Sequence, residues 1–116
     1  MNTVGEKIDI AEVVKTCREF DITEIHKYIA GSGSTRAWSW GFRNAAIAIK
    51  NYAYRFTVSG HHHKGHVYIV LNGLDLFDIY YTSNRGTIKK ISKDVYITEL
   101  IDRIDIDVER IDEYVR

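Results

Sequence analysis

The chain has 116 residues, of which 45% are hydrophobic and 12% aromatic, so it holds enough apolar material for one core and too much for a disordered chain. Its 16 basic and 16 acidic residues cancel, so overall charge favours neither nucleic acid nor an acidic partner. No apolar run approaches the ~20 residues of a membrane-spanning helix, and no signal peptide is visible. The single Cys17 permits no internal disulfide and is interpreted as a small buried side chain. We expect one cytoplasmic domain over 1–116 without a membrane partner.

Two short helices in tandem are predicted near the N-terminus. The Asp9–Glu12 pair has helix-capping spacing and precedes apolar residues at helical intervals, which predicts a helix over about 10–20. The same capping spacing recurs from Asp21, before a second apolar stripe. A second helix over about 22–30 is therefore expected after a tight corner at Asp21.

The centre of the chain has the pattern of an antiparallel meander of three to four strands. The run over 52–71 (YAYRFTVSGHHHKGHVYIVL) alternates apolar and polar residues on both sides of a glycine-bounded tip, which predicts a β-hairpin whose return strand is central. Strands over 76–83 and 87–92 follow tight-turn sequences, and lysines mark the last one as an edge. The run over 45–50 fits either a helix or a strand, and its continuity with the hairpin favours a strand.

An amphipathic helix is predicted at the C-terminus. Apolar residues from Ile97 to Val115 recur at spacings of three and four, after Asp94 as a candidate N-cap. A break over 105–107, capped by aspartates, is an alternative. We interpret the acidic residues as a solvated, ion-paired face rather than a catalytic cluster. They are Asp102, Asp105, Asp107, Glu109 and Asp112.

The predicted fold is α+β. It consists of two short N-terminal helices, a three- to four-stranded antiparallel β-meander and a C-terminal amphipathic helix packed on the sheet. The arrangement of tandem helices before a hairpin also permits a winged helix-turn-helix, in which the second helix reads DNA. That helix offers few base-reading groups beyond His26 and Lys27.

Charge is distributed unevenly along the chain. Residues 36–66 include five Arg or Lys residues and four histidines, with no Asp or Glu. Cations that meet phosphates, beside flat rings that stack on bases, are what a nucleic-acid surface needs; the alternative for the rings is burial in the core. We predict partner binding through the hairpin tip and this basic-aromatic segment. The predicted contacts are Arg36, Trp38, Trp40, Arg43, Lys50, Arg55, His61, His62, His63 and Lys64.

The histidines at the hairpin tip suggest two further hypotheses. Neutral imidazole binds zinc, copper and nickel, and His61 and His63 point the same way in an extended tip. A structural zinc site usually needs four ligands, and neither a Cys pair nor a second His cluster accompanies the tip, so no metal or cofactor is predicted. Protonation of a solvated tip below about pH 6 would strengthen anion binding, because free imidazole has a pKa of ~6.5.

The sequence predicts a small non-enzymatic binding module. No Ser or Cys nucleophile has a recognisable neighbouring base. The favoured partner is anionic, either nucleic acid or an acidic protein surface, and by composition alone the chain is analogous to phage or mobile-element accessory proteins. One alternative is an interaction or inhibitor protein that forms a homo-oligomer through its sheet or C-terminal helix. Another is a metal-binding protein that uses the His-rich tip.

Overall fold

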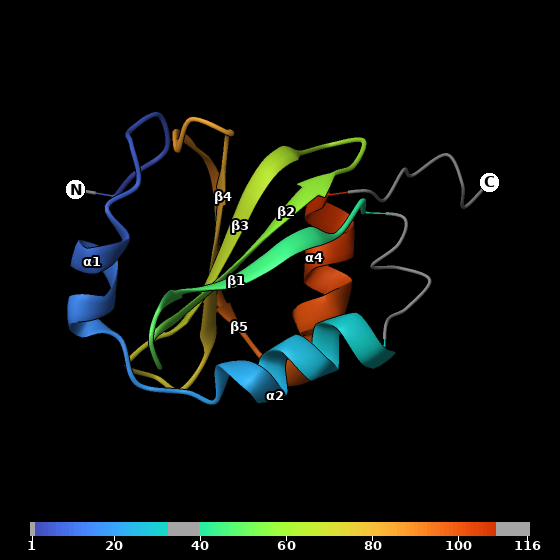
Figure 1. Cartoon of the computed structure of the whole chain (residues 1–116). Coiled ribbons are helices and arrows are strands. Elements are labelled where there is room, and N and C mark those ends of the chain that lie inside the picture. Colours follow the sequence, from blue (N-terminus) through green and yellow to red (C-terminus); the bar gives the residue numbers. More distant parts are fainter. Residues whose placement is uncertain (1, 33–39, 109–116) are drawn as a thin grey trace.

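The computed structural model describes residues 2–32 and 40–108, which build an α+β fold around one antiparallel sheet (Figure 1). Its five strands pair in chain order. The strands are β1 (Arg43–Ile49), β2 (Ala53–Ser59), β3 (Lys64–Leu71), β4 (Phe77–Thr82) and β5 (Ile88–Val95). The helices are α1 (Ile10–Val13), α2 (Ile22–Lys27) and α4 (Leu100–Val108), with shorter helical turns over Val14–Thr16, Tyr28–Ser32 and Ile97–Glu99. The predicted α+β class is confirmed.

The sheet has five strands rather than three or four, because the run that was ambiguous between helix and strand forms β1. Its central residues pair with β2, with Ala46 opposite Arg55 and Ile47 opposite Tyr54. The return strand of the hairpin, β3, lies at the centre of the sheet, as predicted. The lysine-bearing β5 lies at one edge, also as predicted, and β1 forms the other.

The main core lies on the face of the sheet that α2 and α4 cover, here called the inner face (Figure 1). Strand alternation directs every second side chain of β2, β3 and β4 to this face, where the helices contribute their apolar stripes. The largest fully buried side chains of this core are Trp40, Tyr54, Tyr81, Phe56, Ile29, Ile69, Ile79, Leu100 and Ile104.

The opposite face of the sheet, here called the outer face, carries a second and smaller core. Val13 of α1 packs there with apolar residues of the sheet, including Tyr68 and Tyr80. The helices therefore lie on both sides of the sheet (Figure 1).

The first helix is much shorter than predicted. Asp9 caps it as expected, by accepting a hydrogen bond from the Glu12 amide, but helical backbone ends before Cys17. The reason is competition from the sheet, because the Arg18 amide donates to the Leu71 carbonyl at 2.7 Å and pairs the chain with β3. An extended segment, not a tight corner, thus carries the chain to α2 on the inner face.

The start of the last helix also differs from the prediction. Asp94 belongs to β5, with a left-handed φ of 57°, and its carboxylate accepts a hydrogen bond from the Asn72 side chain at 2.8 Å. Helical structure begins only after Tyr96, and α4 runs to Val108 without the break considered over 105–107. No helix in the described part of the chain is both long and apolar enough to cross a bilayer.

Candidate interaction surface

The tryptophan predicted to stack on a partner lies in the core instead. Trp40 is fully buried, and its indole N–H donates to a carboxylate oxygen of Asp105 on α4 at 2.9 Å. The indole therefore ties the start of the β1 region to α4 and offers no face to a nucleobase, which corrects the prediction. Two other predicted contacts, Arg36 and Trp38, lie outside the described residues.

The histidine tip of the hairpin is held against the body of the protein. The His62 amide donates to the Val108 carbonyl at the end of α4, at 2.7 Å. A side chain at Gly60 would collide with Val108, so this glycine permits the close approach. The tip does not project freely into solvent, although His61, His62 and Lys64 are exposed.

His63 does not belong to a solvated tip. Its ring packs edge-on against Tyr81 with ring centroids 5.4 Å apart, and its Nε2 lies 3.3 Å from the His66 carbonyl oxygen. Burial lowers the pKa of His63. The prediction that all three tip histidines are solvated is therefore wrong for His63, which stays neutral to lower pH than a free imidazole.

A basic patch forms on the outer face across β1, β2 and β3. Arg43 of β1 is opposite Thr57 of β2, and Thr57 is opposite His66 of β3, so the three side chains share one face. Arg55 lies two residues before Thr57 and therefore on the same face. The name "basic patch" is used below for Arg43, Arg55 and His66.

The two guanidinium groups of the basic patch are cations without counter-charges among the described residues, and His66 is a weaker base beside them. Burial lowers the pKa of His66, and the nearby charges of Arg55 and Arg43 lower it further. Within residues 2–32 and 40–108, neither arginine forms an ion pair, and the Arg55 Nε atom is buried without a hydrogen-bond partner. His66 Nδ1 is hydrogen-bonded to the Thr57 hydroxyl at 3.0 Å.

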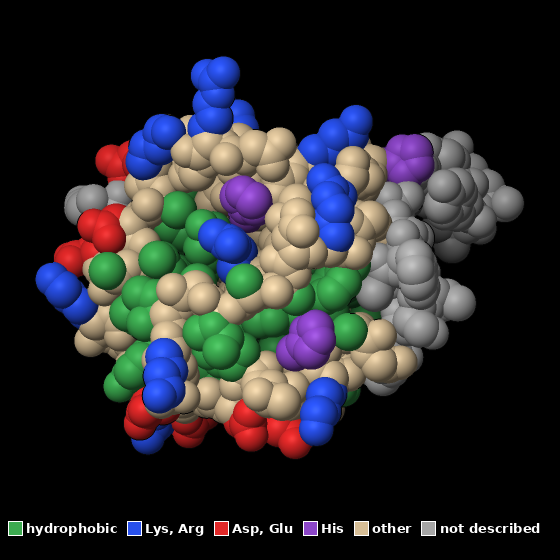
Figure 2. Space-filling view, in the orientation of Figure 1, with side chains coloured by type: hydrophobic (Ala, Val, Ile, Leu, Met, Phe, Trp, Pro, Cys, Tyr) green, Lys and Arg blue, Asp and Glu red, His purple; other side chains and the backbone are tan. Residues whose placement is uncertain are grey.

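The edge strand β1 is unusually apolar for an exposed edge. Residues 44–49 contain no charged side chain, and Ile47 is 59% exposed. Figure 2 shows hydrophobic side chains gathered across the middle of this view, with Lys, Arg and His side chains around and among them and acidic ones near the left and lower margins. The opposite edge, β5, carries Lys89, Lys90 and Lys93, the usual protection against strand pairing.

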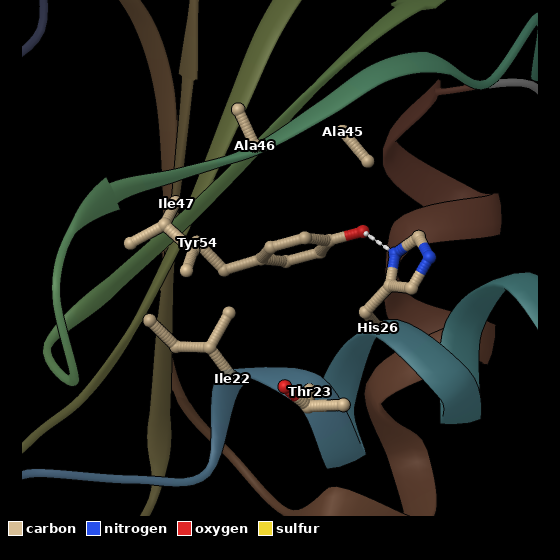
Figure 3. Close-up of a pocket in the computed structure, with 7 residues that line it drawn as sticks. All are labelled: Ile22, Thr23, His26, Ala45, Ala46, Ile47 and Tyr54. Carbon is tan, nitrogen blue, oxygen red and sulfur yellow. Dashed lines mark hydrogen bonds between the residues drawn. The ribbon is translucent and has the colours of Figure 1, made fainter.

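A pocket of about 200 Å³ opens between β1 and α2 (Figure 3). Its lining is mostly apolar. The lining residues are Ile22, Thr23, His26, Ala45, Ala46, Ile47 and Tyr54. The polar part is a hydrogen bond of 2.7 Å between His26 Nδ1 and the Tyr54 hydroxyl. Burial raises the pKa of Tyr54 far above its usual range, so this hydroxyl keeps its proton.

Lys50 lies away from the basic patch. A wider hollow of about 570 Å³ adjoins the pocket, and Lys50 lines it together with Glu19 and Asp21. Of the predicted cations, the structure thus brings Arg43 and Arg55 together, with Lys64 at the start of β3, and places Lys50 in the lining of a separate hollow that also has carboxylates. His66, which the prediction left out, joins the arginines.

The prediction of a solvated acidic face on the C-terminal helix is wrong for Asp107. Asp105 is half-buried against the Trp40 indole, and Glu109 and Asp112 lie outside the described residues. Asp107 is buried, and one of its oxygens accepts hydrogen bonds from the Tyr81 and Ser92 hydroxyls, each at 2.7 Å. Its other oxygen lies 2.7 Å from the Lys90 ammonium. Asp107 therefore fastens α4 to β4 and β5. A signal was available, because Asp107 follows the buried Ile104 by three residues and so shares its face.

Residues 2–32 and 40–108 hold no group of three or more His, Cys, Asp or Glu side chains placed to bind a metal ion. The candidate interaction surface consists of the basic patch, the exposed apolar edge strand β1, and the pocket between β1 and α2. Comparison of the chain with protein-family models, with curated protein sequences and with solved structures finds no significant match.

Proposed function

We propose that the protein is a non-enzymatic binding module that recognises an acidic partner protein through the basic patch. The observation that carries this proposal is the meeting of Arg43, Arg55 and His66 on one sheet face, within a described stretch (40–66) that has no carboxylate. A guanidinium that no carboxylate of the described residues engages can bind a foreign carboxylate with two parallel hydrogen bonds. Two such groups side by side suit a segment that carries several Asp or Glu residues.

An acidic protein fits this surface better than nucleic acid does, because the described rings of the basic-aromatic segment and its neighbouring strand that could stack on bases are mostly buried. Trp40 and Tyr54 lie in the main core, and Tyr68, which is opposite Arg55 in the sheet, is also buried. Binding of single strands depends on exposed rings, and binding of duplexes depends on many phosphate contacts. A chain of zero net charge with a small basic patch offers few phosphate contacts, and the described rings that adjoin the patch offer little stacking surface.

The test compares the binding of the full chain to two probes, poly-glutamate and single-stranded oligothymidine, by biolayer interferometry at low and moderate salt. The double variant Arg43→Gln, Arg55→Gln removes two charges from the patch. The matched control Lys89→Gln, Lys93→Gln removes two charges from the opposite edge strand. We expect salt-sensitive binding of poly-glutamate that the first variant loses and the control retains.

Three outcomes would overturn the proposal. The first is the absence of poly-glutamate binding by the unmodified chain, and the second is an equal loss in both double variants, which would indicate diffuse charge attraction. The third is a preference for oligothymidine that depends on Arg43 and Arg55, which would make nucleic acid the partner.

A further inference from the structure

We infer that β1 accepts an extended segment of the acidic partner as an added strand, with alternating acidic and small apolar residues. This inference rests on the proposed function and specifies the form of the partner. In strand addition, main-chain hydrogen bonds supply affinity, and the pockets that receive alternate side chains supply specificity. The edge strand β1 would supply the main-chain hydrogen bonds, and the pocket and the basic patch next to it would receive the alternate side chains.

The first argument is the state of the two sheet edges. The start of β5 is already paired, because Lys7 forms a bridge with Thr87 and the Gly5 amide donates to the Ile88 carbonyl at 2.8 Å. On β1, only β2 pairs with the strand among the described residues, so the main-chain groups along its other side have no strand partner there. Among the described residues, the apolar edge β1 thus has no second strand partner, whereas the start of β5 has one.

The second argument is the direction of the β1 side chains. Ala45 and Ile47 point toward the pocket and Tyr54, whereas Ala46 points away to the outer face (Figure 3). A strand lying beside β1 would alternate in the same way. One set of its side chains would enter the pocket beside α2, and the other set would lie above the outer face next to the basic patch.

The sizes of the β1 side chains fit this alternation. Arg55 is on β2, and neighbouring strands lie about 4.8 Å apart. Only the methyl group of Ala46 would stand between the Arg55 side chain and an added strand. Arg43 is on β1 itself. Carboxylates on the outer side of an added strand would therefore reach both guanidinium groups. The pocket of about 200 Å³ suits a side chain such as Val or Leu.

Irregularities in β1 limit the length of the added strand. The register shifts on both sides of the pairs that Ala46 and Ile47 form, and Asn44 has a left-handed φ of 56°. Such bulges bend an edge and oppose continuous pairing with long flat strands. The added segment is therefore short, centred opposite Ala46 and Ile47.

A second copy of this chain is a poorer occupant than an acidic segment. The outer-facing residues that its β1 would bring include Arg43, Ala46 and Ile49, and none of them carries a carboxylate to meet the basic patch. The arginines of two copies would instead add to the positive charge on that face. The charge complementarity thus favours a different, acidic chain.

The experiment measures the affinity of the full chain for three short fluorescent peptides by anisotropy. The first alternates Glu and Val, the second has the same composition with the valines in one block, and the third is the alternating peptide with N-methyl groups on alternate amides. We expect the alternating peptide to bind about tenfold more tightly than the block peptide, since a filled apolar pocket is worth about that factor. The N-methylated peptide should also bind more weakly, because it lacks amide donors for main-chain hydrogen bonds. Hydrogen exchange should show new protection of the β1 amides.

Two variants localise the effect. Ala45→Tyr fills the pocket from an exposed position, and Lys93→Tyr places the same side chain on the opposite edge. The first should abolish the advantage of the alternating peptide, and the second should leave it unchanged, with thermal melting confirming that both variants fold.

The outcomes separate this inference from the proposed function. If poly-glutamate binding depends on Arg43 and Arg55 but the block peptide binds as tightly as the alternating one, strand addition is wrong and the proposed function stands. If neither probe binds, both fail. A chain whose mass doubles with concentration, with the β1 amides protected in the absence of peptide, would make a second copy the occupant and overturn the inference.

Discussion

Asp107 shows how a charged residue on the C-terminal helix can serve packing rather than partner binding. Its carboxylate is buried yet satisfied, because two hydroxyls donate to it and the Lys90 ammonium lies beside it. A buried carboxylate that lacks such partners is strongly disfavoured. The network explains why an acidic side chain is tolerated on the buried face of α4, and it leaves no free group there for a partner.

Replacing Asp107 with Ala should destabilise the protein by at least about 2 kcal/mol, because the buried hydroxyls of Tyr81 and Ser92 both lose their acceptor. Tyr81→Phe removes one donor and should cost about 1 kcal/mol. Chemical denaturation measures both effects. The control Glu99→Gln, at an exposed position, should stay within about 0.5 kcal/mol of the unmodified protein. Equal stabilities of Asp107→Ala and the control would show that the network contributes nothing.

The buried His63 predicts a dependence of stability on pH. Its pKa is lowered in the folded state, mainly by burial, so below about pH 6.5 the unfolded chain takes up a proton that the folded chain resists. The free energy of unfolding should therefore fall as pH decreases through this window, and His63 should have no effect on the pH dependence above it. The variant His63→Phe keeps a ring against Tyr81 and should show a shallower decrease. Identical slopes would contradict a buried neutral His63.

At the scale of elements, the hairpin tip is held in place by its contact with the end of α4. Gly60→Ala places a methyl group against the Val108 main chain and should destabilise the protein by about 1–3 kcal/mol. Gly73→Ala, in the next turn, meets no atom within 4 Å and has an ordinary φ, so it should change stability by less than about 0.5 kcal/mol. Thermal and urea unfolding compare the two. Similar effects would mean that the tip is not packed on α4.

Local patterns predicted the elements better than their ends. The capping aspartates Asp9 and Asp21 act as expected, and the hairpin and the edge position of β5 follow from alternation and lysines. The ends were wrong where a distant strand competes for the backbone. Arg18 leaves the helical path to pair with Leu71, and Asp94 stays in β5 to accept from Asn72. No local pattern records these long-range bonds.

At the scale of the whole molecule, the site depends on strand register, which the sequence alone did not specify. Arg43, Arg55 and His66 are far apart along the chain, and they meet only because Thr57 is opposite both Arg43 and His66. Composition did predict the excess of cations in this part of the chain. It could not show that Trp40 is buried or that Lys50 lines the same hollow as Glu19, because both depend on how the helical segments cover the sheet.

The central claim is that the basic patch beside β1 is the surface that meets an acidic partner. A backbone amide chemical-shift titration of the full chain with poly-glutamate tests it most directly, since it maps contacts residue by residue. We predict shifts concentrated at Arg43 to Ile47, Arg55 to Thr57 and His66, which weaken as salt is added. Shifts centred on the exposed tip histidines, on β5 or on α4, or no shifts at all, would contradict the account.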